Sequence, residues 1–259
     1  MKDTHVDYDA LAPTYNQRFS DDHDRPATAR ALTDMVHRLD AQTILEAGCG
    51  TGRWLAGLRA LTEQGYGLDP SKGMLAQAHA RGMQLQLTRG RGEALPFPDA
   101  TFDLVYCVNA IHHMDGQQTF IREARRVLRD GGALAVIGMD PHIGRETWYV
   151  YDYFPGTYET DLARFPSWET VLDWMRAAGF QKVERRPVER IIDHKTSETV
   201  LDDPFLQKHA ASQLALLSDA AYAAGVQRIK TAVAEAEAAG DTLIFPTELI
   251  MEMVCGTNL

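Results

Sequence analysis

Three glycines follow a short apolar run, and this part of the chain is the best candidate for holding a ligand. Thr43 to Ala47 is apolar and β-branched, and Gly48, Gly50 and Gly52 follow it before a helix-like segment over Arg53 to Leu61. A strand that turns abruptly into a helix needs residues that accept positive φ, and a backbone without Cβ atoms lets a ligand lie against the main chain. The end of this strand is therefore predicted to cradle a small molecule.

The spacing of the glycines narrows the choice of ligand. A dinucleotide fingerprint starting at Gly48 needs a small residue where this chain has Arg53, and a phosphate-binding P-loop needs a Lys-Ser/Thr pair that is absent. The stretch reads instead as an acidic residue, Glu46, followed by GxGxG. In this it resembles motif I of the class I methyltransferases that use S-adenosylmethionine. The alternative is a tight strand-to-helix turn that holds no ligand.

A second predicted strand, Gln64 to Leu68, ends at Asp69. The carboxyl ends of parallel strands share one rim of a sheet, so Asp69 is expected beside the glycines, where its carboxylate can accept both hydroxyls of a ribose. Its alternative role is that of a helix cap. GLDPSKGML resembles the second motif of the same family, and the resemblance implies that Pro70 and Met74 flank the adenine.

The stretch from Arg89 to Met114 also resembles this family, with one departure. Arg91 stands where the family commonly has an acidic residue that reads the adenine amine. Backbone groups at Gly92 and Glu93 are therefore expected to contact the adenine. The resemblance further implies that Asn109, after a predicted strand over Phe102 to Val108, touches the methionine part of the cofactor.

The N-terminal stretch Tyr8 to Tyr15, YDALAPTY, resembles the first helix of ubiquinone-biosynthesis-type methyltransferases. That helix closes over the cofactor, which implies that Tyr15 lies near the methionine end. We expect the helix to span Asp7 to Phe19. An ordinary apolar stripe facing the core is the alternative.

Several side chains could serve as a general base. His113 and His112 are the first candidates because imidazole titrates near neutral pH. Either ring could instead hydrogen-bond to loop backbone. Lower-ranked candidates are Asp140, His142, His194 and His209. A sulfonium donor is already activated, so a base is needed only if the nucleophile carries a proton of high pKa.

The elements that position these residues predict an α/β fold: a Rossmann-like, doubly wound sheet of seven strands with the last antiparallel. N-terminal helices precede the sheet, and a helical insertion separates the sixth strand, Gln181 to Pro187, from the seventh, Glu248 to Gly256. We expect one methyltransferase domain over residues 1–259. Its parts are an N-terminal helical cap (1–40), a cofactor-binding core (41–140), an aromatic substrate loop (141–166) and a helical insertion or lid (188–246).

Other elements follow from apolar periodicity. We expect a third strand over Met83 to Thr88, a fifth over Ala133 to Met139 and a helix over Gln117 to Arg129, whose four arginines are predicted to be solvated. The rings of residues 148–165 are predicted either to wall an aromatic or apolar acceptor pocket or to form a satellite core. The insertion could add to the lid or provide a homodimer contact.

The amino-acid composition and net charge limit which molecules this protein is expected to bind. The chain has 259 residues, 45% of them hydrophobic, and a formal net charge of −10, which argues against nucleic acid and anionic membranes and favours a small neutral or cationic ligand. The three cysteines show no CxxC pairing, so we expect reduced thiols and no metal site. The polar N-terminus and the lack of a membrane-spanning apolar run predict a cytoplasmic protein.

These observations together predict transfer of a methyl group from S-adenosylmethionine to the O, N or C atom of a small-molecule acceptor by in-line displacement, with S-adenosylhomocysteine as the product. A protein of the same fold that binds S-adenosylmethionine or S-adenosylhomocysteine without turnover is the alternative. A nicotinamide-dependent oxidoreductase fits less well because of Arg53.

Overall fold

The computed structural model describes residues 5–19, 25–82, 85–144 and 147–259. Its strands form one sheet in the order β3-β2-β1-β4-β5-β8-β6, and β7 pairs with the opposite edge of β8. The strands are β1 (Thr43–Ala47), β2 (Gln64–Asp69), β3 (Gln86–Arg89), β4 (Phe102–Val108), β5 (Leu128–Gly138), β6 (Thr147–Trp148), β7 (Gln181–Thr196) and β8 (Ile244–Thr257). β1 to β5 pair in parallel, whereas β8 is antiparallel to both β5 and β7. The predicted Rossmann-like fold is confirmed, with the two-residue strand β6 as an eighth strand beyond the seven expected.

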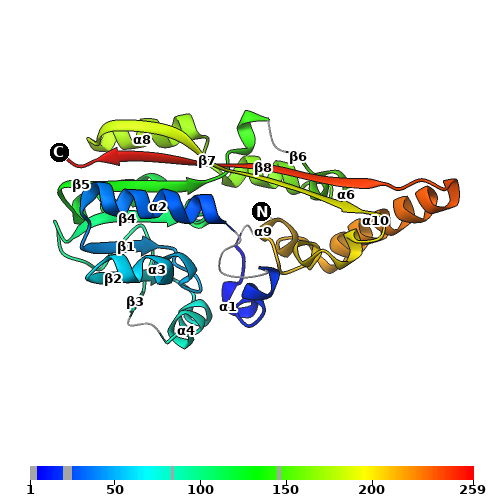
Figure 1. Ribbon diagram of the computed structural model, residues 1–259, viewed down its shortest axis with the longest axis horizontal. Coiled ribbons are helices and arrows are strands. Elements are labelled where there is room, and N and C mark those ends of the chain that lie inside the picture. Colours follow the sequence, from blue (N-terminus) through cyan, green and yellow to red (C-terminus); the bar gives the residue numbers. More distant parts are fainter. Residues whose placement is uncertain (1–4, 20–24, 83–84, 145–146) are drawn as a thin grey trace.

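Helices cover both faces of this sheet (Figure 1). They are α1 (Tyr8–Leu11), α2 (Pro26–Leu39), α3 (Arg53–Leu58), α4 (Lys72–Ala80), α5 (Gln117–Val127), α6 (Tyr149–Tyr153), α7 (Thr157–Arg164), α8 (Trp168–Ala178), α9 (Ser212–Ala215) and α10 (Asp219–Ala239). Alternate residues of the central strands face opposite cores. Ile44 packs with α2 and α3, whereas Leu45 packs with α5 and α8.

Two strands extend well beyond the others. β7 continues to Thr196 instead of ending at Pro187, and β8 begins at Ile244 instead of Glu248. The two strands pair out to Thr196 and Ile244, so each satisfies the backbone of the other. The residues between them are therefore 197–243, a shorter insertion than expected, and Figure 1 shows α6 and α10 alongside this extension.

The N-terminal segment is less helical than expected. Instead of one helix over Asp7 to Phe19, α1 ends at Leu11 and a separate 3-10 turn, η1, covers Tyr15–Arg18. Pro13 lies between them, and its ring disfavours a continuous helix. The chain thus bends twice before α2.

The observed bounds of two elements near the middle of the chain also differ from the predicted ones. α5 ends at Val127, and β5 begins at Leu128 rather than Ala133, because Leu128 already pairs with Phe102 before a register shift. β3 begins at Gln86, and Met83 lies outside the described residues.

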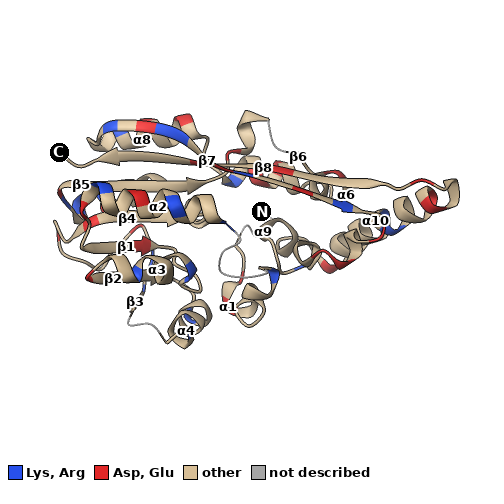
Figure 2. Cartoon of the chain, viewed as in Figure 1, with Lys and Arg blue, Asp and Glu red and all other residues tan. Residues whose placement is uncertain are grey.

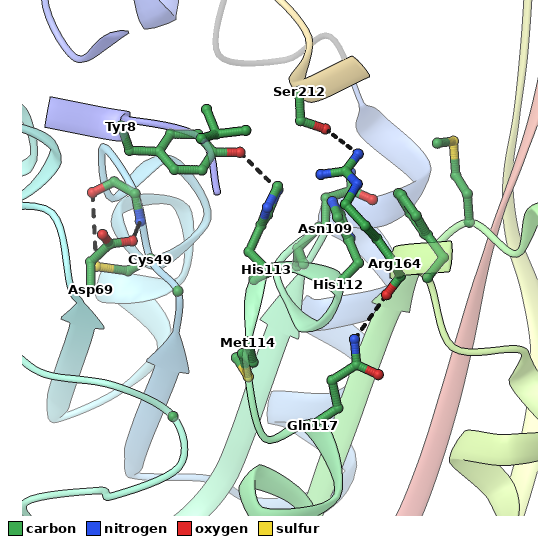
Figure 3. Close-up of a pocket in the computed structure, with 18 of the residues that line it drawn as sticks. Tyr8, Cys49, Asp69, Asn109, His112, His113, Met114, Gln117, Arg164 and Ser212 are labelled. Atoms are coloured by element: carbon green, nitrogen blue, oxygen red, sulfur yellow. Dashed lines mark hydrogen bonds between the residues drawn. The ribbon is translucent and has the colours of Figure 1, made fainter. Parts of the chain in front are cut away.

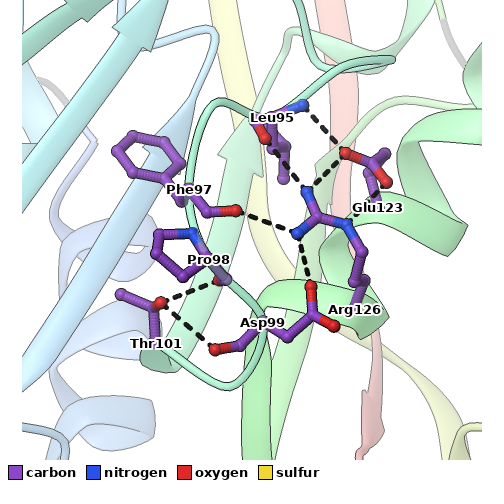
Figure 4. Close-up of polar contacts among 7 residues, drawn as sticks. All are labelled: Leu95, Phe97, Pro98, Asp99, Thr101, Glu123 and Arg126. Atoms are coloured by element: carbon purple, nitrogen blue, oxygen red, sulfur yellow. Dashed lines mark hydrogen bonds and ion pairs between the residues drawn. The ribbon is translucent and has the colours of Figure 1, made fainter.

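The arginines of α5 are not all solvated as predicted. Arg126 donates through Nη1 to the carbonyl of Phe97 (2.9 Å) and to Asp99 (2.8 Å), and through Nη2 to the carbonyl of Leu95 (3.0 Å) and to Glu123 (2.7 Å) (Figure 4). One side chain thus ties the turn that leads into β4 to α5.

Basic and acidic residues are interspersed along the helices and the β7–β8 extension (Figure 2). Cys49, Cys107 and Cys255 are free and buried. Among the residues that the structure describes, no helix is long and apolar enough to cross a membrane.

Candidate active site

One large cavity of about 1280 Å³ lies at the carboxyl ends of β1, β2 and β4. N-terminal residues, the α7–α8 region and the insertion complete its walls. Most of the predicted site residues line it together: Tyr15, Glu46, Gly48, Gly50, Asp69, Pro70, Met74, Gly92, Glu93, Asn109, His112 and His113. Gly52 and Asp140 are not part of its lining.

The glycines after β1 have different functions. A Cβ on Gly48 would lie 2.5 Å from the Cβ of Ala110, so this position packs tightly against the loop after β4. Gly50 has a φ of +52° and open space where a Cβ would stand. Gly52 precedes α3, and its Cβ would meet Ala78 at 3.0 Å. Gly50 is thus the glycine that leaves the backbone open to a ligand.

Asp69 links the glycine turn to the next helix. Its Oδ2 accepts from the Gly50 amide at 2.8 Å, and its Oδ1 accepts from the Ser71 amide at 2.9 Å. Burial raises the pKa of Asp69 above its ordinary value, and the two amide hydrogen bonds partly offset this. Each carboxylate oxygen has a further lone pair. The side chain therefore has the capacity to accept two ribose hydroxyls.

Glu46 lies deeper than Asp69. Its Oε2 accepts from the Leu55 amide at 2.9 Å and from the Tyr106 hydroxyl at 3.3 Å. Burial raises the pKa of Glu46 to about 8. This carboxyl group borders the cavity and holds the start of α3 against β1.

The expected adenine end has an acidic residue that the sequence pattern did not identify. Arg91 is exposed and pairs with Asp115 at 2.5 Å, and both line the cavity. Glu93 accepts from the Gly116 amide at 2.9 Å, which fixes its carboxylate. Pro70 is exposed to the cavity, whereas Met74 is buried against α1. Asp115 lies 24 residues from Arg91 in the chain, and only the fold brings it to this rim.

The two histidines lie at the centre of the cavity wall (Figure 3). Nε2 of His113 and the hydroxyl of Tyr8 share a hydrogen bond of 2.7 Å. His112 stacks on Phe165, with ring centroids 3.7 Å apart and an interplanar angle of 12°. Burial, reinforced by Arg164, lowers the pKa of His113 to about 3, and burial with the neighbouring ring lowers that of His112 well below its ordinary value. Both imidazoles are therefore neutral at physiological pH.

Asp9 holds the N-terminal segment over the Asp69 side of the cavity. Its Oδ1 accepts from the Ser71 hydroxyl and the Gly73 amide, both at 2.6 Å, which places α1 against the start of α4. Tyr15 lines the cavity, and the Arg18 guanidinium lies 3.8 Å from its ring centroid.

Asp140 hydrogen-bonds within the protein and does not face the cavity. It is buried, contacts His142 Nδ1 at 2.9 Å and accepts from the Trp168 amide at 2.7 Å at the start of α8. His142 lines the cavity, whereas His194 and His209 do not.

The aromatic segment divides between the cavity wall and a separate core. Trp148 and Phe165 line the cavity, whereas Tyr149 and Phe154 pack with residues of α10 and β8 in a separate core. The insertion also reaches the cavity, through Phe205, Ala210, Ala211, Ser212 and Gln213.

Comparison with known proteins identifies the family. A model of the methyltransferase domain matches residues 45–136. A demethylmenaquinone methyltransferase of Anoxybacillus flavithermus is 31% identical over 183 residues, which cover 60% of this chain and 77% of the relative. The chain belongs to the class I S-adenosylmethionine-dependent methyltransferases. S-adenosylmethionine is thus its methyl donor, and S-adenosylhomocysteine its product.

Other members of the methyltransferase family match over similar lengths. The demethylmenaquinone methyltransferase of Chlorobaculum parvum is 26% identical over 214 residues, 70% of this chain and 86% of the relative. A structure from Anabaena variabilis, described as a methyltransferase of an antibiotic biosynthesis pathway, aligns with a TM-score of 0.65 over 87% of this chain and 96% of its own, at 21% identity. This likeness shows the shared fold.

No group of three or more His, Cys, Asp or Glu side chains able to hold a metal ion occurs within the described ranges.

Proposed function

We propose that this methyltransferase acts on a small aromatic or apolar acceptor held in the same cavity as its cofactor. The observation that carries the proposal is the composition of that cavity. One side is formed by the glycine turn and Asp69, and the same cavity is also lined by Trp148, Phe165 and Phe205. A volume of about 1280 Å³ exceeds the roughly 300–1,000 Å³ typical of a pocket for one ligand. It leaves room for two small molecules side by side.

The residues near Asp69 would hold the cofactor. Asp69 would accept the ribose hydroxyls, the backbone at Gly50 would lie along the cofactor, and Gly92 and Asp115 would border the adenine. Asn109 follows β4 directly and has a φ of +50°, a backbone conformation that residues other than glycine rarely adopt, and it lines the cavity. We assign it, with Tyr15, to the methionine part. The bound cofactor supplies a methyl group already activated on a sulfonium.

The chain's own contribution to the reaction is then alignment and exclusion of water. The N-terminal segment and the insertion cover the cavity through Tyr8 and Phe205. His112 presents a neutral ring whose unprotonated nitrogen can accept a hydrogen bond from an acceptor O–H or N–H, whereas Nε2 of His113 is already hydrogen-bonded to the Tyr8 hydroxyl. Their depressed pKa values make them weak bases, so their main role would be to orient the nucleophile. The hydrogen bond from Tyr8 fixes the orientation of the His113 ring.

The first experiment is a calorimetric titration of the purified protein with S-adenosylhomocysteine, with NAD as the control. Micromolar binding of S-adenosylhomocysteine and none of NAD is the expected result. A screen of phenols, quinols and amines with S-adenosylmethionine, followed by S-adenosylhomocysteine production, then tests the acceptor class. Turnover with a protein or nucleic acid substrate, and none with small molecules, would contradict the proposal.

A homodimer through residues 197–243 remains a prediction. Analytical ultracentrifugation of the wild-type chain distinguishes a dimer from a monomer.

A further inference from the structure

A buried arginine lies at the end of the cavity that the proposed cofactor site does not use. Arg164 is the last residue of α7, it lines the cavity, and only 5% of its side chain is exposed. Figure 3 shows its guanidinium beside His112, on the other side of the histidine pair from Asp69. A group bound by Arg164 therefore belongs to the acceptor and not to the ribose.

Several N–H groups of the Arg164 guanidinium have no hydrogen-bond partner in the described structure. Nη2 of Arg164 donates to Asp161 Oδ1 at 2.7 Å and to Ser212 Oγ at 3.1 Å. Its Nε and Nη1 are shielded from solvent and have no hydrogen-bond partner among the residues that the structure describes. A guanidinium carries five N–H groups, so three remain for a ligand. Leaving donors of a buried cation unpaired is costly, and an anionic ligand removes that cost.

Neighbouring elements fix the position of this arginine. Asp161 also accepts from Tyr151 (2.9 Å) and Gln213 (2.7 Å), so its charge is shared among three donors. The backbone carbonyl of Arg164 accepts from Gln117 Nε2 at 2.9 Å. Contacts from α5, α6 and α9 thus hold the guanidinium in place before any ligand arrives, which lowers the entropic cost of binding.

The surroundings of Arg164 indicate the rest of the ligand. The ring of the adjacent Phe165 stacks on His112, and Trp148 and Met139 line the same cavity. The acidic lining residues Glu46, Asp69, Glu93 and Asp115 come from β1, β2 and the loops that build the proposed cofactor side. A cation among apolar and aromatic side chains suits a ligand with a ring or hydrocarbon body and one negative group.

We propose that Arg164 binds a carboxylate of the methyl acceptor, which makes the substrate class an aromatic or apolar acid. This inference rests on the proposed small-molecule function. Arg18 also lines the cavity, but its guanidinium donates to the Ala210 carbonyl and lies over the Tyr15 ring. The Arg164 guanidinium alone matches a monoanion, whereas a phosphate dianion is better matched by several cationic donors. The net charge of −10 favours neutral or cationic ligands at long range, but solvent screens that field within about 10 Å. The buried guanidinium acts at contact distance, where screening is weak.

The test uses the wild-type protein saturated with S-adenosylhomocysteine. It is titrated calorimetrically with 4-hydroxybenzoic acid and 4-hydroxycinnamic acid, each against its methyl ester, and with phenyl phosphate. At least one acid is expected to bind ten or more times tighter than its ester. Arg164→Met should abolish this preference while S-adenosylhomocysteine affinity changes less than threefold. Arg122→Met, which removes an exposed arginine of α5, should leave both unchanged.

Arg164→Met leaves the buried Asp161 without its cation, so a second variant protects the test against misfolding. Asp161→Asn combined with Arg164→Met removes both charges, and the amide oxygen can still accept from Tyr151 and Gln213. It should fold and show no preference for acids. A wild-type protein that fails to bind S-adenosylhomocysteine overturns the proposed function. The carboxylate assignment alone is overturned if the wild-type protein binds S-adenosylhomocysteine but binds no acid more tightly than its ester, or binds phenyl phosphate best. A double variant that still prefers acids also overturns it.

Discussion

Asp69→Asn tests the proposed cofactor site most sharply because the structure shows which hydrogen-bond acceptor positions of this carboxylate are still free. Each oxygen of Asp69 already accepts one backbone amide, from Gly50 or Ser71, at 2.8 and 2.9 Å. That leaves one lone pair on each oxygen for the two ribose hydroxyls. The asparagine keeps one carbonyl acceptor, loses the charge and places an NH₂ group where the other oxygen accepted.

The expected loss follows from this count. A hydrogen bond to a charged group contributes about 1.5–3 kcal/mol, and about 1.4 kcal/mol corresponds to a factor of ten in affinity. Asp69→Asn removes one such bond outright and the charge from the other. S-adenosylhomocysteine should therefore bind about 10- to 100-fold more weakly, and Asp69→Ala should weaken binding further. Isothermal titration calorimetry at constant salt measures both.

A matched control separates ligand binding from loop structure. Asp103 also accepts from two backbone amides, Gln42 at 2.9 Å and Thr43 at 2.8 Å, both on Oδ2, while its Oδ1 pairs with Arg129 at 2.6 Å, and it lies at the opposite end of β1. Asp103→Asn should lower the melting temperature, because it removes a carboxylate that holds backbone amides and Arg129, and leave S-adenosylhomocysteine affinity unchanged. The ribose assignment is refuted if Asp69→Asn binds S-adenosylhomocysteine as tightly as the wild type, or if both variants lose affinity equally.

Three further predictions use other parts of the molecule. Gly50→Ala should weaken S-adenosylhomocysteine binding about tenfold or more, because the new side chain strains a positive φ and places a methyl group where the backbone is open to a ligand. Gly57→Ala, within α3, should leave the affinity unchanged. Calorimetry measures both. Arg126→Ala should lower the free energy of unfolding in urea by about 1 kcal/mol, because two partly buried carbonyls lose their donor, without changing S-adenosylhomocysteine affinity. An equal loss in Arg122→Ala, which removes an exposed arginine, would contradict this reasoning. The pKa of His113 falls from 6.5 to about 3 on folding, so the unfolded chain binds the extra proton and stability decreases as the pH falls below 6.5. Urea unfolding at pH 7.5 and 5.5 should show that the stability difference between wild type and His113→Gln changes by about 1.4 kcal/mol per pH unit below 6.5. A difference that does not change with pH would mean that folding leaves the pKa of His113 unshifted.

Local signals along the chain determined the fold and the cofactor motifs. A buried strand followed by glycines, and a second strand ending in an acidic residue, place Gly50 and Asp69 on one rim in any parallel sheet. The core strands and α8, from its Ser167 cap to Gly179, were predictable for the same reason, since apolar periodicity and caps are local properties. Boundaries failed where pairing between distant residues decided them, as with β7 and β8.

The tertiary structure alone decided which polar groups meet in the cavity. Asp140 and His142 have equally suitable side chains in the sequence, yet Asp140 is turned to the α8 amide while His142 lines the cavity. The hydrogen bond between Tyr8 and His113 spans 105 residues, and Arg164 meets Ser212 across 48. The depressed pKa values of the histidines come from burial among these neighbours. Residue types and their spacing thus predict the glycine turn and Asp69 at one rim, whereas burial and long-range contacts decide which polar groups face the cavity, because burial and long-range contacts are not encoded within a single element.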